Sequence, residues 1–255
     1  MIDNYNRIVI KFGTTTLFDN ENKSMMEERI QNICFSIAGF MEEDKEIVVV
    51  SSGAVAMGKI ILEDLLKELD ELTAKQIAGG VGQTALNTAW QHAFAAVGSI
   101  AIPIVLQTPQ LDDSIVIKSL EKIINNRMIP VINENIPLQS EHDNDQLAAE
   151  IAVHINANLL IIFSDINGIY TADPGVNPDA RHIEIVKDLN DQIGSIAGNS
   201  ISGKGTGGMI TKLKAAAIAA KQGIPTIIAN GNVDDPFDSL ENSEKHTLVK
   251  TQAMY

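Results

Sequence analysis

The sequence predicts an α/β fold, a three-layer αβα sandwich with an open, mostly parallel sheet at its centre. Short runs of Ile, Val and Leu recur along the 255 residues, and they are apolar at consecutive positions rather than at alternate ones. Longer segments with helical spacing of apolar residues separate these runs. Strands that are apolar on both faces need cover on both faces, and helices that join parallel strands provide it.

Six apolar runs are predicted to be the main strands of this sheet. They are rich in β-branched residues, which favour an extended backbone, and polar or glycine residues follow most of them. A shorter run at 182–186 is predicted to be a further strand. The six main runs are 7–12, 46–52, 99–106, 128–135, 158–165 and 225–230.

Helical segments lie between these strands. In the segment 22–41, Ser24 and Glu27 have the spacing of a capping box, which predicts the start of a helix there. The segment 73–98 is a long helical run of small residues, and another helix follows a glycine-rich stretch near residue 208. The remaining predicted helices are 113–126 and 145–157.

Residues 168–198 interrupt the alternation of strand and helix. Pro174, Gly175 and Pro178 are turn signals that lie close together, so this segment is predicted to be an insertion at the C-terminal end of a strand. The sequence shows no internal repeat, low-complexity run or linker. Residues 1–255 are therefore predicted to form a single domain.

The composition limits the partners and the environment of the chain. Hydrophobic residues make up 45% and the formal net charge is −14, so a large core is expected beneath a surface that repels nucleic acid and anionic membranes. The single cysteine, Cys34, is expected to be a structural free thiol, and the N-terminus lacks a signal-peptide pattern. We therefore expect a cytoplasmic protein with no nucleic-acid or membrane partner.

Small polar residues follow the predicted strands where the strands end. Parallel strands bring their carboxyl ends to one edge of a sheet, and ligands of open α/β folds bind at that edge. Together with Lys11, these residues suit a phosphate-rich ligand that lies across the edge. The set is Gly13, Ser52, Gly53, Ala54, Asn133, Ser164, Asp165 and the DND triplet at 143–145.

A glycine-rich stretch at 202–208 precedes a predicted helix that carries Lys212. Glycine lets backbone N–H groups approach an anion, and the lysine adds a cation. Residues 198–204 match the start of a P-loop, but Gly205 stands where Ser or Thr is required and no strand precedes the stretch, which argues against a P-loop. The five histidines lack metal-ligand spacing, so no metal site made of protein ligands is predicted.

Each of these signals also has a purely structural explanation. Lys11 can be a solvated residue at a strand end, the glycines can form a plain loop, and the triplet at 143–145 can be a helix N-cap. Asp165 can simply begin a turn. Their occurrence together at one sheet edge is what favours a binding site.

Taken in order, several stretches resemble the glutamate 5-kinase branch of the amino acid kinase family. The resemblance extends from Ile8 to about Gly231 and implies an eight-stranded sheet, with the acceptor in the N-terminal half and the nucleotide in the C-terminal half. We expect the chain to be a short form without the C-terminal PUA domain of many members. The matching stretches are VIKFGTTTL, VVVSSGAVAMGK, KQIAGGVGQTAL, IPVINEN, DNDQLAAEIA, FSDINGIYTADPGVNP, AGNSISGKGTGGMITKLKAA and GIPTIIANG.

The resemblance implies phosphoryl transfer from ATP, with Mg²⁺, to the side-chain carboxylate of L-glutamate, the first step of proline synthesis. A carboxylate is ionised near neutral pH and needs no general base, so the task is to bring two anions together. The implied catalytic residues are Lys11 and Lys212, on either side of the transferred group, and Asp145, which orients them. The implied nucleotide-binding set is Lys11, Gly13, Ser164, Asp165, Thr206, Gly207, Gly208, Met209, Ile210, Thr211 and Lys212.

The acceptor side departs from the family pattern at one position. The family has an aspartate that contacts the substrate where this chain has Ile136, and the connection from there to Asp143 is shorter. Glu134, Glu141 or Asp143 could provide the missing charge for an ammonium group. The implied acceptor set is Ser52, Gly53, Ala54, Asn133, Ile136 and Asn144.

Two other functions stay open at this point. The first is a family member that phosphorylates a different carboxylate, a carbamate or a phosphate. The second is a nucleotide-binding regulatory protein without catalysis, against which the presence of Lys11, Asp145 and Lys212 argues. The resemblance also implies a homo-oligomer, either a dimer or a tetramer.

Overall fold

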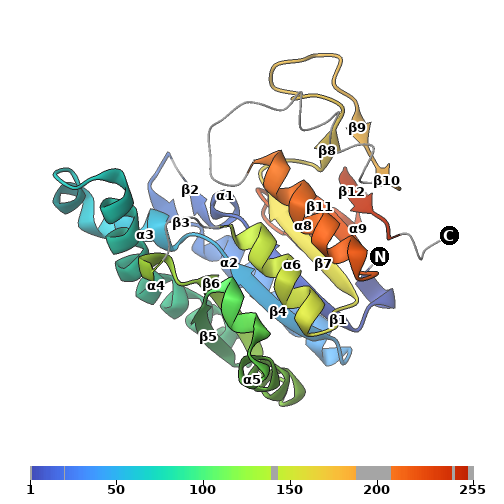
Figure 1. Cartoon of the computed structure of the whole chain (residues 1–255), viewed down its shortest axis with the longest axis horizontal. Helices are drawn as coiled ribbons and strands as arrows, with labels where there is room; N and C mark the ends of the chain where they lie inside the picture. Colours follow the sequence, from blue (N-terminus) through green and yellow to red (C-terminus); the bar gives the residue numbers. More distant parts are fainter. Residues whose placement is uncertain (1, 20, 139–142, 188–207, 243–244, 252–255) are drawn as a thin grey trace.

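The computed structural model describes residues 2–19, 21–138, 143–187, 208–242 and 245–251. Eight strands of this part form the central sheet. Figure 1 shows the labelled strands lying side by side between the helices. They are β1 (Arg7–Phe12), β4 (Glu46–Ser51), β5 (Ala101–Leu106), β6 (Ile129–Glu134), β7 (Leu159–Ser164), β10 (Ile185–Val186), β11 (Thr226–Asn230) and β12 (His246–Val249).

The strand order is β10-β12-β11-β7-β1-β4-β6-β5. Every neighbouring pair is parallel except β11 with β12, which is antiparallel. The predicted class, an αβα sandwich with an open, mostly parallel eight-stranded sheet, is confirmed. Two small antiparallel ladders lie outside this sheet: β2 (Phe18–Asp19) with β3 (Ser24–Met25), and β8 (Ile169–Tyr170) with β9 (His182–Ile183).

The helices cover both faces of the sheet. They are α1 (Thr14–Leu17), α2 (Glu27–Glu42), α3 (Ala54–Leu62), α4 (Glu71–Ala96), α5 (Ser114–Asn125), α6 (Asn144–His154), α8 (Met209–Lys221) and α9 (Pro236–Glu241). The 3-10 turns are η1 (Ile2–Asn4), η2 (Glu63–Leu66), η3 (Thr108–Asp112) and η4 (Ile136–Leu138). Among the described residues, no helix has both the length and the apolar character that crossing a bilayer requires.

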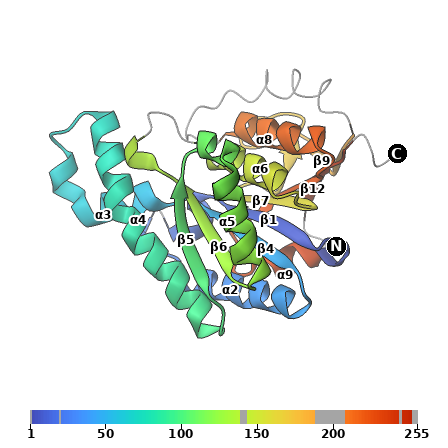
Figure 2. The same ribbon diagram turned by 60° about the horizontal axis from the view of Figure 1, so that its bottom comes forward.

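Side-chain alternation along β1 assigns each face of the sheet to its own helix layer. Ile8, Ile10 and Phe12 belong to a core with α2, α4 and α9, whereas Val9 belongs to a core with α5, α6 and α8. Figure 2 shows α6 and α8 on one side of the sheet and α2 and α9 on the other. Lys11 shares the parity of Val9, so its side chain lies on the α6 and α8 side.

Three details of the sequence-based prediction need correction. Ser24 does not cap α2: it lies in β3, which pairs with β2, and the N-cap is Met26 without a side-chain cap bond. The run 182–186 is not one strand but two, because β9 pairs with β8 while β10 pairs with β12 at the sheet edge. The helices α3 and α9 and the strand β12 are not predicted at all.

Two helices pack unusually closely beside the sheet edge. A Cβ at Gly58 of α3 would lie 1.8 Å from the carbonyl oxygen of Ala78, and one at Gly82 of α4 would lie 1.9 Å from that of Ala54. Only glycine permits this approach of α3 to α4. It follows that the small-residue segment of α4 serves packing against α3, next to the loop that ends β4. Cys34 lies in the core as expected, and burial raises the pKa of its thiol.

Candidate active site

Two lysines from distant parts of the chain meet on one buried carboxylate. Lys11 of β1 places Nζ 2.6 Å from Oδ1 of Asp145, and Lys212 of α8 places Nζ 3.3 Å from Oδ2 of the same residue. The side chains of Lys11, Lys212 and Asp145 are 7%, 3% and 1% exposed. Thr211 Oγ1 donates a hydrogen bond to Asp145 Oδ2 over 2.8 Å. The result is a compact cationic pair with a shared anion, which we call the lysine–aspartate cluster (Lys11, Asp145 and Lys212).

The electrostatics keep Asp145 ionised. Burial would raise the pKa of this carboxyl, but the charges of Lys11 and Lys212 and the hydrogen bonds to it outweigh burial and lower the pKa to about 2. Burial also lowers the pKa of Lys212, and the charge of Asp145 opposes that shift. Each charge in the cluster therefore depends on its partner, because a single buried charge would be strongly disfavoured.

Local structure at the start of α6 explains why Asp145 reaches the lysines. Asp143 is the N-cap, and its Oδ1 accepts hydrogen bonds from the backbone N–H groups of Asp145 and Gln146. The N-cap explanation of the DND triplet therefore holds for Asp143, which leaves the Asp145 side chain available to the cluster. The packing of α6 against α8 then brings Asp145 to Lys212.

The residues expected to bind nucleotide gather beside this cluster where the structure describes them. Ser164 ends β7 and donates from Oγ to Oδ1 of Asp165 over 2.9 Å. The charge of the exposed Asp165 acts with that of Asp145 against the lowering of the Lys212 pKa by burial. Gly13 lies beside Lys11, since a Cβ there would be 3.7 Å from Nζ, and its N–H donates to the carbonyl of Phe163. Gly208 is the N-cap of α8.

The first turns of α8 carry the remaining described members of that set. Met209 is half-buried, Ile210 is exposed and Thr211 contacts Asp145. Lys214 is exposed, as expected for a solvated helix residue. Thr206, Gly207 and the stretch 198–205 lie outside the described residues.

A neutral cluster lies on the acceptor side of the same edge. Asn144 Nδ2 donates to Ser52 Oγ over 3.1 Å and to Asn133 Oδ1 over 2.9 Å. Asn133 Nδ2 donates in turn to Gln83 Oε1 of α4 over 2.7 Å. Three of the residues expected to bind the acceptor are thus joined to each other directly.

Two other expected acceptor residues form the turn from β4 into α3. Gly53 has φ +113°, and a Cβ there would come within 2.6 Å of the ring of Phe18, so both backbone and space require glycine. Ala54 begins α3 and is fully buried. Both positions keep the chain compact beside Ser52.

Ile136 is a buried packing residue and not a polar contact for a substrate. It is 6% exposed and begins η4, where its side chain packs onto α4: a Cβ at Gly79 would lie 2.4 Å from Ile136 Cγ2. The structure therefore joins Ile136 to the packing of η4 on α4. The charge that an aspartate would bring to this position is absent.

Two acidic groups lie close to that position. Glu134 is the last residue of β6, and its side chain accepts a hydrogen bond from the backbone N–H of Asp143. Burial, reinforced by the charge of Asp143, raises the pKa of Glu134 to about 7. Burial, reinforced by Asp145, also raises the pKa of Asp143. Lys75 of α4 is near enough to oppose the shift of Glu134. Glu141 lies outside the described residues.

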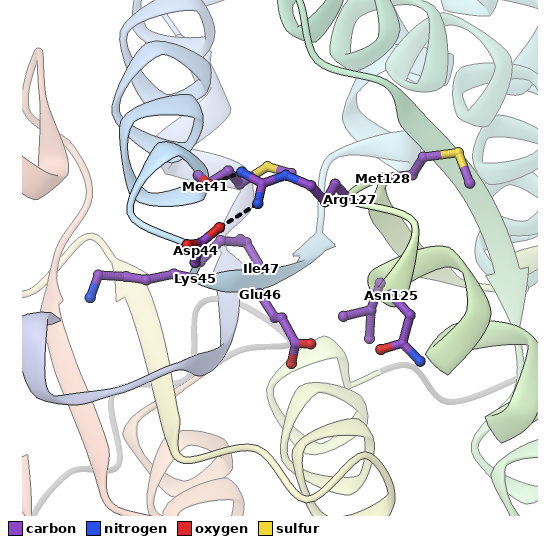
Figure 3. A pocket seen from close by; sticks show the side chains of 9 residues that line it. Met41, Asp44, Lys45, Glu46, Ile47, Asn125, Arg127 and Met128 are labelled. Atoms are coloured by element: carbon purple, nitrogen blue, oxygen red, sulfur yellow. Dashed lines mark hydrogen bonds and ion pairs between the residues drawn. The ribbon is translucent and has the colours of Figure 1, made fainter.

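A cavity of about 170 Å³ lies at the opposite edge of the sheet, where β4 and β6 begin. Figure 3 shows Arg127 bridging to Asp44 and to the backbone of Met41 at this cavity. Glu46, which also lines it, is paired with Arg7. The charged side chains at this cavity thus have ion-pair partners, and we assign no function to it. The described residues contain no group of three or more His, Cys, Asp or Glu side chains placed to hold a metal.

Sequence reasoning missed Gln83 and Lys75 as neighbours of the site. Both lie on α4, whose regular pattern of small residues gave no reason to single out a polar side chain. A usable signal exists for Gln83: alternation along β6 places Asn133 on the same face as Val131, which packs on the α4 side. A polar residue of α4 is therefore needed opposite Asn133.

Comparisons with known proteins identify the family of the chain. The profile of the amino acid kinase family matches residues 6–230. The glutamate 5-kinase of Dictyoglomus turgidum is 37% identical over 247 residues, which are 94% of this chain and 65% of that protein. The glutamate 5-kinase of Caulobacter vibrioides is 37% identical over 260 residues, 97% of this chain and 68% of that protein.

Solved structures share the fold at much lower identity. Carbamate kinase from Giardia lamblia bound to AMP-PNP superposes with a TM-score of 0.72 at 16% identity, covering 98% of this chain and 99% of that one. UMP kinase from Ureaplasma parvum superposes with a TM-score of 0.67 at 18% identity, covering 96% of this chain and 99% of that one. The chain spans about 65% of the length of the first of the sequence relatives. From the matched profile and these relatives, the chain belongs to the amino acid kinase family.

Proposed function

We propose that the chain transfers the γ-phosphoryl group of ATP to the side-chain carboxylate of L-glutamate, giving γ-glutamyl phosphate for proline synthesis. The observation that carries this proposal is the lysine–aspartate cluster, in which two cations from β1 and α8 converge on one buried carboxylate. The choice of glutamate is supported by the glutamate 5-kinases that are 37% identical to this chain.

The proposed mechanism depends on position and charge rather than on proton transfer. The acceptor carboxylate is ionised near neutral pH, so it attacks the γ-phosphorus without a general base, and the bond from phosphorus to the β,γ-bridging oxygen breaks. Lys11 and Lys212 stabilise the negative charge on the transferred group. Asp145 keeps both ammonium groups charged and aimed, and its own low pKa makes it unsuited to act as a base.

The nucleotide is proposed to lie on the β7 and α8 side. Ser164, Asp165 and the start of α8 from Gly208 to Lys212 are the described residues that would hold it, and Thr206 and Gly207 complete the proposed set. The buried cations fit a polyphosphate, because they offer positive charge in a chain that is acidic overall. Mg²⁺ would accompany the nucleotide and supply charge neutralisation of the phosphates, held chiefly by phosphate oxygens and water.

The acceptor is proposed to lie on the β4, β6 and α4 side. Ser52, Gly53, Ala54, Asn133 and Asn144 would surround it, and the ammonium group would be balanced by Glu134 and Asp143 instead of by residue 136. Burial of Ile136 against Gly79 supports this assignment, because Ile136 has no polar atom to offer. The N-terminal half thus serves the acceptor and the C-terminal half the nucleotide within one domain.

We also propose a cytoplasmic homo-oligomer, dimer or tetramer. A single, buried cysteine suits a reducing compartment. Light scattering of the purified chain tests the oligomer, and a monomeric mass at working concentration would contradict it.

An acceptor panel tests the proposed function. The purified chain is incubated with ATP, Mg²⁺ and hydroxylamine, and acyl phosphate is trapped as hydroxamate with L-glutamate, L-aspartate or glutarate. We expect hydroxamate with L-glutamate and much less with glutarate, which lacks the ammonium group. Folded protein that binds ATP but gives no hydroxamate with glutamate would overturn the proposal. Equal rates with glutarate would overturn the role given to Glu134 and Asp143.

A further inference from the structure

A chain of side-chain amides connects α4 to the acceptor side of the site. Gln83 Nε2 donates to Asn87 Oδ1 over 2.8 Å, so Gln83 Oε1 is turned toward Asn133 and accepts from its Nδ2 over 2.7 Å. Asn133 Oδ1 then accepts from Asn144 Nδ2 over 2.9 Å. We call this the amide relay (Asn87, Gln83, Asn133 and Asn144).

The relay has a defined direction because one of its donors cannot be reversed. The backbone N–H of Glu134 donates to Asn133 Oδ1 over 2.9 Å, and a backbone N–H can only donate. With Oδ1 held there, the Nδ2 group of Asn133 needs an acceptor, and Gln83 is the residue that provides one. The amide of Asn133 is therefore held at both of its ends.

The relay passes from one helix layer to the other over the carboxyl edge of the sheet. Gln83 belongs to α4 on the side of Ile8 and Phe12, whereas Asn144 begins α6 on the side of Lys11. Gly79 and Gly82 bring α4 close to η4 and α3, which places Gln83 within reach of β6. A residue in the layer opposite the lysines is thereby coupled to the site.

The relay determines which atom of Asn144 can accept a hydrogen bond. Its Nδ2 is engaged with Asn133 and Ser52, and its Oδ1 is buried with no hydrogen-bond partner among the residues that the structure describes. An ammonium group carries N–H donors and needs acceptors. Ile136 offers none, so the orientation of Asn144 matters more here than it would beside an acidic residue.

We propose that Gln83 is a positioning residue for acceptor binding, acting through Asn133 to present Oδ1 of Asn144 to the substrate. This inference rests on the proposed function and extends it to a residue of α4. The hydrogen bonds of the Gln83 side chain go to Asn87 and Asn133, and not to the lysine–aspartate cluster. Its loss should therefore weaken acceptor binding and leave phosphoryl transfer and nucleotide binding intact.

A matched pair of substitutions tests the positioning role. Gln83→Met removes both hydrogen bonds with similar volume, and Gln31→Met makes the same change on the exposed face of α2. We expect Gln83→Met to raise KM for L-glutamate about 5- to 10-fold, with kcat and KM for ATP within about 2-fold of the parent. Gln31→Met should change none of the three. An unchanged KM for glutamate in Gln83→Met, or a loss confined to kcat, would overturn the proposal.

A conservative variant separates orientation from packing. Gln83→Glu keeps an acceptor for Asn133 Nδ2 while giving up the bond to Asn87, so its KM for glutamate should stay within about 3-fold of the parent. If Gln83→Glu and Gln83→Met raise KM equally, α4 packing rather than the acceptor atom is responsible, and the proposal fails.

A readout without turnover separates this inference from the proposed function. The side-chain NH₂ signal of Asn133 in ¹⁵N-labelled protein, identified by its absence in Asn133→Asp, should exchange with water at least about 10-fold faster in Gln83→Met than in Gln31→Met. Equal exchange rates would contradict the relay. Wild-type protein that makes no hydroxamate contradicts the proposed function alone, and the exchange comparison still decides whether Gln83 holds Asn133.

Discussion

The two edges of the sheet hold opposite charges in different ways. At the carboxyl edge, Lys11, Asp145 and Lys212 are almost completely buried and share one carboxylate. At the amino edge, Arg127 pairs with Asp44, and these side chains are 59% and 85% exposed. The same kinds of charged group thus occur in a dry setting at one edge and in a wet setting at the other.

This difference in burial separates charged groups that we propose to act in function from charged groups that are ordinary surface ion pairs. Burying an ion costs several kcal/mol of desolvation free energy. An ion-pair partner offsets this cost only when the geometry is close, so a buried charged cluster contributes little net stability. Exposed pairs contribute between about 0 and 1 kcal/mol. Under the proposed function, the burial of the lysine–aspartate cluster is explained by the positive charge that it offers to a phosphate group.

The largest expected effect is the removal of the shared anion. Asp145→Ala leaves two buried ammonium groups without their common partner, so the free energy of unfolding should fall by about 3 to 5 kcal/mol. Urea titration followed by circular dichroism measures this. A fall below about 1 kcal/mol, typical of a surface ion pair, would show that the cluster is not buried as described.

A pH titration of stability examines Glu134 next. Its pKa is raised to about 7 by burial, so between pH 4.5 and 7 the folded chain binds a proton that the unfolded chain has released. The free energy of unfolding should therefore fall as pH rises across this window, by roughly 2 to 3 kcal/mol. Glu134→Gln should remove this slope, and an identical slope in the variant would contradict the assignment.

Acid has the opposite effect through Asp145. Its pKa is lowered to about 2 by the two lysines despite burial, so its contribution is present above the ordinary value of 3.8 and is lost as pH falls toward 2. Stability should drop by about 2 kcal/mol in this range. Comparison with Asp145→Asn isolates the contribution, because the variant should lose this part of the acid dependence. If stability falls with pH in the same way in the parent and in Asp145→Asn, the low pKa assigned to Asp145 is contradicted.

The smallest expected effect concerns the amino edge. Arg127→Ala removes an exposed pair with Asp44, so the free energy of unfolding should change by less than about 1 kcal/mol, and activity should not change. Thermal unfolding and the hydroxamate rate measure both. A large loss of activity would mean that the cavity beside Arg127 has a role that its paired charges do not suggest.

Much of the fold follows from the sequence because it depends on local periodicity. Alternation along 7–12 places Lys11 opposite the core of Ile8 and Ile10, and the strand ends collect the polar residues at one edge. The meeting of Asp145 with Lys212 follows from no such pattern: it depends on how α6 packs on α8, and the sequence suggests it only through family resemblance.

Two further features depend on contacts that the local pattern does not reveal. Gln83 reaches Asn133 because glycines let α4 approach η4 and α3, and no propensity of the helix reveals such a crossing. Ser24 has the capping-box spacing to Glu27, yet it lies in β3 and pairs with Asp19 of β2. At Ser24, the pairing of two neighbouring strands overrides the capping signal.

The most direct test is single-turnover transfer of labelled phosphate from ATP to L-glutamate by Lys212→Met and Lys11→Met, with binding of AMP-PNP measured on the same samples. Both variants should stay folded and still bind the nucleotide, though more weakly than the parent. At saturating nucleotide the transfer rate should fall by about 100-fold or more in each, because each lacks a cation that acts on the transition-state charge. Transfer at the parent rate in either variant would contradict the account.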